Sequence, residues 1–187
     1  MLYDRVLDLA DAEQMRSEIA ALAAPRTLMV EGVSQGRLGI EQFRFWVSEP
    51  AAAWEMVRDN GARWSYVEGV VDYGGGEPRQ LDFIASLPEQ LKMLWPTELL
   101  LWGNRPTHFR PVLLQRIGQS SLLLTLEHGE DPAMRQTMVV DRFTGIATKR
   151  IEYDRGLILT SVVALGETPP NLDATFEPVT DWIRSEY

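Results

Sequence analysis

The sequence predicts an α+β fold: a single, strongly bent antiparallel sheet with helices packed on its concave face. Three features indicate this class. Many segments alternate apolar and polar residues with a period of two, as strands with one buried face do. The connections between them contain glycine, and most also contain Asp, Asn or Ser, which is the composition of tight turns. A short, unusually apolar segment in mid-chain has helical spacing instead. We expect about nine strands and four or five helical pieces.

The length and composition fit one ordinary globular domain over residues 1–187. The chain is 45% hydrophobic and 24% charged, so it can fold around a core of its own. Its 18 basic residues are scattered among 27 acidic ones, for a net charge of -9. This balance argues against nucleic acid as a partner and against electrostatic docking on an anionic membrane.

Cysteine is absent, which excludes disulfides, thiol nucleophiles and Cys-ligated zinc. No apolar stretch approaches the roughly 20 residues of a membrane-spanning helix, and no secretory signal is visible. As written, the chain is expected to be soluble and cytoplasmic. A trimmed mature form of an envelope protein would have the same sequence.

The first part of the chain combines a helix with a group of strands. Residues 1–24 form the N-terminal helix, because apolar residues recur at helical spacing over residues 5–22. Residues 25–78 form the first strand group, in which 63–71 is expected to be one strand. The turn before that strand is Asp59-Asn60-Gly61, and Asn-Gly favours a tight hairpin because both positions accept positive φ.

The middle of the chain interrupts the strands. Residues 79–105 are apolar at helical spacing, and Pro88 and Pro96 divide them into two or three short helices. An insert this apolar must lie against something, most simply the open face of the sheet. Residues 106–187 form the second strand group, and a coil at 171–176 leads to a short C-terminal helix.

No catalytic constellation is recognisable. The only histidines, His108 and His128, lack a partner at metal-ligand spacing, and no nucleophile elbow or phosphate-binding loop is complete. We therefore predict no catalytic residues, no metal and no cofactor. The expected activity is non-enzymatic binding.

The surplus of aromatic and apolar residues has two interpretations. These side chains either form the core of the domain or line a cavity between sheet and insert, where a hydrophobic ligand binds. A filled core and a lined cavity use the same residues, so the sequence leaves both open.

Several short segments, in their order along the chain, resemble the lipoprotein-carrier (LolA/LolB-like) superfamily. Residues 43–54 are similar to its strand, proline and second strand, and residues 59–66 to its D-G-x-x-x-W-x-Y hairpin. Residues 139–145 and 172–176 are similar to late segments of the same superfamily. One departure is Glu55. The family often has an arginine directly after the aromatic residue that corresponds to Trp54, and the lid-latching role of that arginine does not transfer to this chain.

The resemblance implies an open half-barrel with a helical lid and a hydrophobic interior that binds lipid or acyl groups. By analogy, the ligand-binding residues on the sheet would be Phe43, Phe45, Trp54, Trp64 and Tyr66, and those on the lid Leu91, Leu94, Trp95, Leu99 and Trp102.

Two hypotheses follow for function. The first is a carrier-like protein that binds a lipid or acyl chain in a hydrophobic cavity between sheet and lid. The alternative is a protein–protein interaction or regulatory sensor module that uses the same fold with its cavity collapsed.

Overall fold

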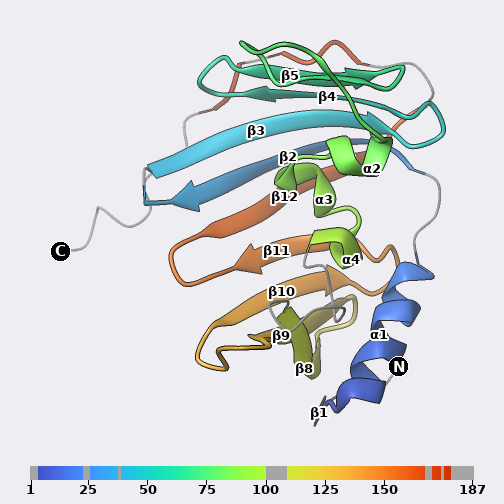
Figure 1. The fold of residues 1–187 in the computed structure, drawn as a ribbon, viewed down its shortest axis with the longest axis vertical. Helices are drawn as coiled ribbons and strands as arrows, with labels where there is room; N and C mark the ends of the chain where they lie inside the picture. The colour runs from blue at the N-terminus through green and yellow to red at the C-terminus, as the bar shows by residue number, and fades with distance from the viewer. Residues whose placement is uncertain are drawn as a thin grey trace.

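The fold is a single antiparallel sheet with short helices on one face (Figure 1). The computed structural model describes residues 4–22, 26–37, 39–99, 109–166, 170–173 and 175–177. Within these ranges the sheet has twelve strands, and four helices accompany it. The predicted class, one antiparallel sheet with a few short helices, is confirmed.

The chain forms its elements in three runs. The first is β1 (Arg5–Val6), α1 (Leu9–Ala20), β2 (Thr27–Gly36), β3 (Gly39–Ser48), β4 (Ala53–Arg58), β5 (Arg63–Val67), β6 (Val70–Asp72) and β7 (Arg79–Gln80). The insert follows with α2 (Phe83–Ser86), α3 (Glu89–Lys92) and α4 (Pro96–Leu99). The last run is β8 (Phe109–Ile117), β9 (Ser121–His128), β10 (Arg135–Asp141), β11 (Ala147–Ile151) and β12 (Gly156–Ala164).

Two meanders meet at the middle of the sheet. The strand order is β1-β8-β9-β10-β11-β12-β2-β3-β4-β5-β6-β7, so β2 joins the two runs by pairing with β3 on one side and β12 on the other. Since β1 lies at the far edge beside β8, α1 carries the chain back from that edge to the centre. Residues more than 120 positions apart in sequence are thereby held as neighbours, as in the pair of Met29 with Val163.

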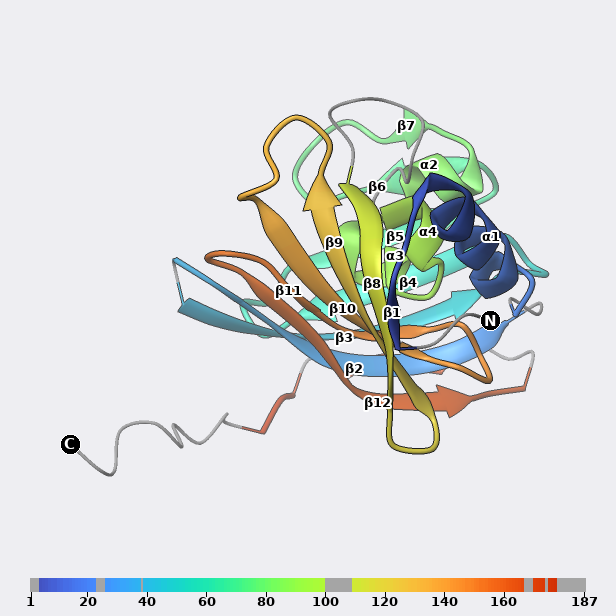
Figure 2. The same ribbon diagram turned by 90° about the horizontal axis from the view of Figure 1, so that it is seen from below.

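Alternation along the strands gives the sheet two different faces. On β3, Phe43, Phe45 and Val47 point into a large core under the helices, whereas Arg44 and Trp46 lie on the opposite face. Figure 2 shows α1, α2 and α4 together on one side of the sheet. The helix-covered side is called the inner face below, and the other side the outer face.

The sheet is not strongly curled, so the prediction of a strong bend is wrong. Its edge strands, β1 and β7, are two residues long and stand at opposite ends of the strand order. Closure into a barrel requires edge strands to pair with each other. These two do not, so the sheet stays open.

Two predicted elements have different boundaries. The helix expected over residues 5–22 begins only at Leu9, because Asp8 caps it: the Asp8 side chain accepts a hydrogen bond of 2.9 Å from the Asp11 amide. Residues 5–6 form β1 instead. The strand expected over 63–71 is divided into β5 and β6 by Glu68 and Gly69, whose φ values of 52° and 84° make a tight hairpin turn.

The predicted C-terminal helix lies outside the described residues. In the part of this region that the structure describes, residues 170–173 and 175–177 have neither helix nor strand.

Gly32 on β2 gives a test of how closely the inner face is packed. A Cβ at this position would lie 2.4 Å from Cζ of Phe43 and 2.5 Å from the carbonyl oxygen of Ile158. Because the second atom is backbone, we expect Gly32→Ala to lower the free energy of unfolding by about 1–3 kcal/mol. Urea denaturation measures this. The matched control is Gly36→Ala at the end of the same strand, where nothing lies within 4 Å, and a change within about 0.5 kcal/mol is expected. Equal losses in both variants would contradict the packing argument.

Candidate functional site

The predicted ligand-binding residues meet in one cluster on the inner face. The fully or nearly fully buried ones are Phe43, Phe45, Trp54, Tyr66, Leu91, Leu94 and Trp95, all in the main core. Trp64 and Leu99 are partly buried and pack against that core. Trp102 lies outside the described residues. The structure thus brings the described residues of the predicted site together, while their role as a ligand site stays a prediction.

A continuous series of aromatic rings links the sheet to the insert. Trp54 stacks on Tyr66 with ring centroids 6.4 Å apart, Tyr66 meets the edge of Phe83 at 5.8 Å, and Phe83 meets Trp95 at 5.8 Å. The apolar helical spacing predicted for the insert includes Leu81 and Ile84 but not Phe83, yet Leu81 and Ile84 are exposed and Phe83 packs against the core. The helices here are single turns separated by prolines, so helical spacing does not hold across them.

Hydrogen bonds from the polar atoms of aromatic side chains join the first half of the insert to the sheet. The Trp54 indole N–H donates to Oγ of Ser86 at 3.0 Å, and the Tyr73 hydroxyl donates to the Ser86 carbonyl at 2.9 Å. The Tyr66 hydroxyl donates to the carbonyl of Leu81 at 3.0 Å. These rings therefore line the inner face and also fix the position of α2.

Arg26 ties the second half of the insert. This side chain precedes β2 and is buried, with Nη1 donating to the carbonyl of Leu94 and Nη2 to that of Thr144 at 2.5 Å. Its guanidinium also lies 5.8 Å from the centroid of the Trp95 ring, within range of a cation–π contact. Burial lowers the pKa of Arg26, and the nearby charge of Glu49 opposes that shift. Arg26 thus joins the insert to the turn between β10 and β11.

A third set of ties joins α3 to the second meander. Glu89 forms ion pairs with Arg150 on β11 and with Arg155 in the next turn. Arg150 is buried, and its Nε donates to Oε1 of Gln136 at 3.2 Å. The Ala147 amide donates to the carbonyl of Met93 at 2.8 Å. The insert is therefore anchored to strands on both sides of the β2–β12 strand pair, which is called the seam below.

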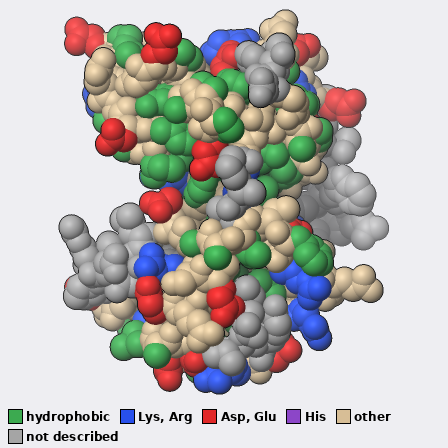
Figure 3. All heavy atoms as spheres, turned by 90° about the vertical axis from the view of Figure 1, so that its right-hand side faces the viewer, with side chains coloured by type: hydrophobic (Ala, Val, Ile, Leu, Met, Phe, Trp, Pro, Cys, Tyr) green, Lys and Arg blue, Asp and Glu red, His purple; other side chains and the backbone are tan. Residues whose placement is uncertain are grey.

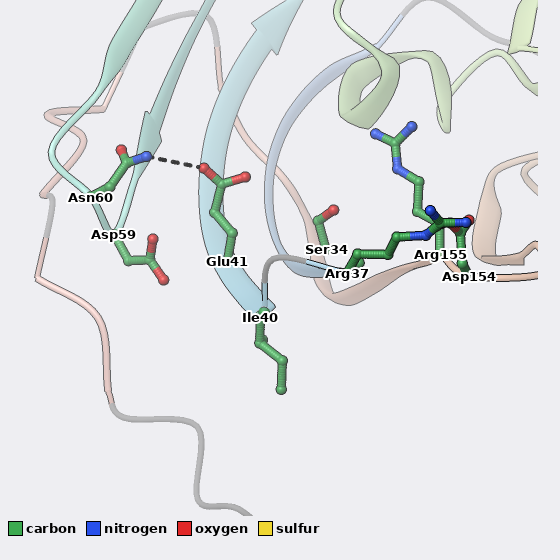
Figure 4. Close-up of a pocket in the computed structure, with 10 residues that line it drawn as sticks. Ser34, Arg37, Ile40, Glu41, Asp59, Asn60, Asp154 and Arg155 are labelled. Atoms are coloured by element: carbon green, nitrogen blue, oxygen red, sulfur yellow. Dashed lines mark hydrogen bonds and ion pairs between the residues drawn. The ribbon is translucent and has the colours of Figure 1, made fainter.

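Two cavities lie at the hairpin tips, away from the predicted site. One of about 560 Å³ is lined by the turns after β2, β4 and β11 and has charged walls (Figure 4). Arg37 and Asp154 pair there at 2.6 Å, and Asn60 donates to Glu41 across the cavity. Its mixed charges suit a polar molecule better than an acyl chain.

The second cavity, of about 490 Å³, shares Arg37 and Asp154 as a wall with the first. Its lining is more apolar, with Phe109, Met134 and Tyr153, whose side chain is 96% exposed. Neither cavity is lined by any residue of the predicted site.

Among the residues that the structure describes, no group of three or more His, Asp or Glu side chains is placed to hold a metal ion. His128 has a structural role, since its Nδ1 accepts hydrogen bonds from the amides of Glu130 and Asp131 at 3.3 and 3.2 Å. His108 lies outside the described residues. Within the described ranges, none of the helices has the length and apolar character needed to cross a bilayer.

The fold is similar to that of MucB. That solved structure shares 19% sequence identity with this chain over 87% of its length, with a TM-score of 0.54. The chain spans 61% of the MucB chain. The likeness shows the fold alone.

Two further solved structures match more loosely. The MucA/MucB complex of Pseudomonas aeruginosa matches at 18% identity over 84% of this chain and 59% of that one, with a TM-score of 0.49. The LolA superfamily protein NE2245 from Nitrosomonas europaea matches at 10% identity over 84% of this chain and 94% of that one, with a TM-score of 0.38. The predicted resemblance is confirmed at the level of the fold, through the similarity to MucB at low sequence identity. No protein-family model matches the chain, and no curated protein matches its sequence.

Arg26 provides the test of the insert's attachment. In Arg26→Met the buried carbonyl of Leu94 loses its donor, which costs about 1–3 kcal/mol, and the part-buried hydrogen bond to the Thr144 carbonyl is lost as well. We expect urea denaturation to show a loss of about 2–4 kcal/mol. We also expect faster amide hydrogen exchange over residues 83–99.

The matched control is Arg37→Met, which removes an arginine with 77% side-chain exposure and one ion pair. Its effect should lie within about 1 kcal/mol, with exchange over the insert unchanged. Faster exchange spread evenly over the sheet in Arg26→Met would mean that Arg26 stabilises the fold without holding the insert.

Proposed function

We propose that the chain is a non-catalytic binding protein that holds the apolar part of a lipid or acyl chain between the inner face of the sheet and the insert α2–α4. One observation carries this proposal. The insert covers an aromatic wall of the sheet, yet it is joined to the strands mainly by side-chain ties and not by a strand ladder. Displacing it leaves every strand pair of the sheet intact.

The energies involved allow such a displacement. Each tie contributes about 0.5–1.5 kcal/mol net, so releasing a handful of them costs several kcal/mol. Burial of an acyl chain stabilises the complex by about 0.8 kcal/mol per methylene. A chain of roughly ten methylenes therefore offsets the loss of these ties when it also replaces the contacts of the buried insert side chains Leu91, Leu94 and Trp95, and a much shorter one does not. The proposal thus selects long-chain ligands.

The core is also suited to repacking around a ligand. Methionine supplies four of its buried side chains: Met15, Met56, Met93 and Met138. An unbranched thioether adapts to irregular spaces with little strain, so these side chains can fill the space beside ligands of different shape.

An apolar surface lies next to the first helix of the insert. Figure 3 shows hydrophobic side chains gathered on the upper half of one side of the molecule, over the end of the sheet where β4, β5 and α2 lie. The exposed hydrophobic residues of this end are Val67, Val70, Tyr73, Leu81 and Ile84. A hydrophobic ligand would first contact this surface before it passes under α2.

A specific observation also favours the second candidate, a protein-interaction or regulatory sensor module. Phe43, Phe45, Trp54, Leu91 and Leu94 have no exposed surface at all, as expected of a core that is filled by its own side chains. In this alternative the insert stays in place, and partners bind the outside of the molecule.

A cysteine pair separates the two candidates. Because Ala147 donates to Met93 through the backbone, these residues lie side by side on β11 and the insert. The variant Met93→Cys/Ala147→Cys contains the only cysteines of the chain, so oxidation can create only this crosslink within a molecule. The probe is a dansyl-labelled undecanoic acid, titrated by fluorescence. We expect uptake by the wild-type chain and by the reduced variant. Oxidation should weaken it at least about tenfold, or roughly 1.4 kcal/mol.

The single variant Met93→Cys, treated with the same oxidant, is the control and should keep its uptake. Unchanged binding in the crosslinked protein would show that the ligand does not enter beneath the insert. Absence of uptake by the wild-type chain, together with organic extracts that contain no lipid by mass spectrometry, would favour the protein-interaction module.

A further inference from the structure

The outer face of the sheet carries a second apolar cluster, which is covered by a distant segment of the chain. Trp46, Ala53 and Val57 form its floor, and Leu172 lies on them. Met29, Leu165 and Phe176 pack around this cluster. The floor and its covering are called the outer slot below, and the described residues 170–173 and 175–177 are called the strap.

Two arginines of the outer slot are held in place by the sheet itself. Nε of Arg44 on β3 pairs with Glu31 on β2 at 2.6 Å, and Arg63 on β5 pairs with Glu55 on β4. Each guanidinium thus uses one donor on a neighbouring strand and has others left for an occupant of the slot.

The strap is bound through its backbone and its apolar side chains. Arg63 donates to the Leu172 carbonyl at 3.1 Å, Arg44 to the Asp173 carbonyl at 2.7 Å, and Gln42 to the Glu177 carbonyl at 2.7 Å. The Phe176 ring lies 5.2 Å from the Arg44 guanidinium. These contacts are made to backbone carbonyls and to two apolar residues four positions apart, Leu172 and Phe176. They do not depend on the identity of the side chains between the two anchors.

One donor of the slot has no partner in the strap. Trp46 is only 7% exposed, and its indole N–H finds no acceptor among the described residues. A buried N–H without a partner is rare in a finished core. The described residues of the strap therefore cover Trp46 without supplying an acceptor, and a segment that places a carbonyl or hydroxyl oxygen over Trp46 fits better.

We propose that the outer slot is a docking site for a non-helical segment of a partner protein, and that the strap occupies it in cis. The partner segment carries two large apolar residues four positions apart, as Leu172 and Phe176 are in the strap, and an acceptor that meets Trp46. Its backbone carbonyls accept from Arg44 and Arg63, as those of the strap do. The site uses the face of the sheet opposite the insert, so it does not rest on the proposed lipid binding.

The test uses the full chain with a weakened strap. In Leu172→Ser/Phe176→Ser both apolar anchors are lost, while every residue of the sheet remains. A fluorescein-labelled synthetic peptide with the sequence of residues 166–178 is then titrated by fluorescence anisotropy. We expect it to bind this variant with a dissociation constant between micromolar and millimolar. Binding to the wild-type chain should be at least about tenfold weaker, because the strap competes at an effective concentration in the millimolar range.

Two controls make the result specific. A peptide with the same two Leu→Ser and Phe→Ser changes should not bind, and adding Arg44→Met to the variant should weaken the intact peptide several-fold. Thermal unfolding by circular dichroism verifies that the variant is folded. If the double variant fails this check, Phe176→Ser alone replaces it, since Phe176 is only partly buried.

Three outcomes would overturn the proposal. A folded variant that takes up no peptide at millimolar concentration shows that the strap is only a cover. Equal binding of the altered peptide shows a nonspecific apolar surface. Concentration-dependent dimerisation of the wild-type chain, lost in the variant, assigns the slot to the strap of a second copy and not to a partner protein.

Discussion

The pairing of β2 with β12 holds the two halves of the molecule together. Without this ladder the chain would form two separate meanders, β2 to β7 and β8 to β12, each with an apolar face too large for the short helices to cover. With it, one core cluster runs from Leu114 on β8 to Tyr66 on β5. Gly32 lies within this seam, where only a residue without a side chain leaves room for the Phe43 ring beside the β12 backbone. The close approach of β12, β2 and β3 therefore sets the geometry of the whole inner face.

The position of the insert is a consequence of that seam. Its ties come from both halves of the sheet, with Trp54 on β4, Arg26 before β2 and Arg150 on β11. Helices of four residues have almost no stability of their own, so these contacts and the burial of Leu91, Leu94 and Trp95 define where the insert lies. Under the proposed function, the insert moves as a lid while the strand pairs of the sheet remain formed.

The sequence was sufficient for local features and insufficient for distant ones. Alternation predicted the inward side of Phe43 and Phe45, and the turn at Asp59-Asn60-Gly61 lies between β4 and β5 with Gly61 at a φ of 83°. No local pattern could show that β12 pairs with β2, because partner choice between distant strands depends on the whole core. Arg26 was missed for the same reason. It stands outside any periodic segment, and its role arises only when Leu94 and Thr144 are brought to it.

Trp46 shows what alternation means for a sheet one layer thick. The period that sends Phe45 to the inner face sends Trp46 to the outer one, among Arg44, Glu31 and Glu55. An aromatic ring among these charged side chains is favourably shielded from water, and the sheet has no second layer of strands to shield it. The strap, more than 120 residues away in sequence, does so through side-chain donors and two apolar anchors. Both faces are thus closed by segments that are not strands of the sheet. A cover attached by side chains can be exchanged for another molecule of similar shape, and the two binding proposals rest on this property of the two faces.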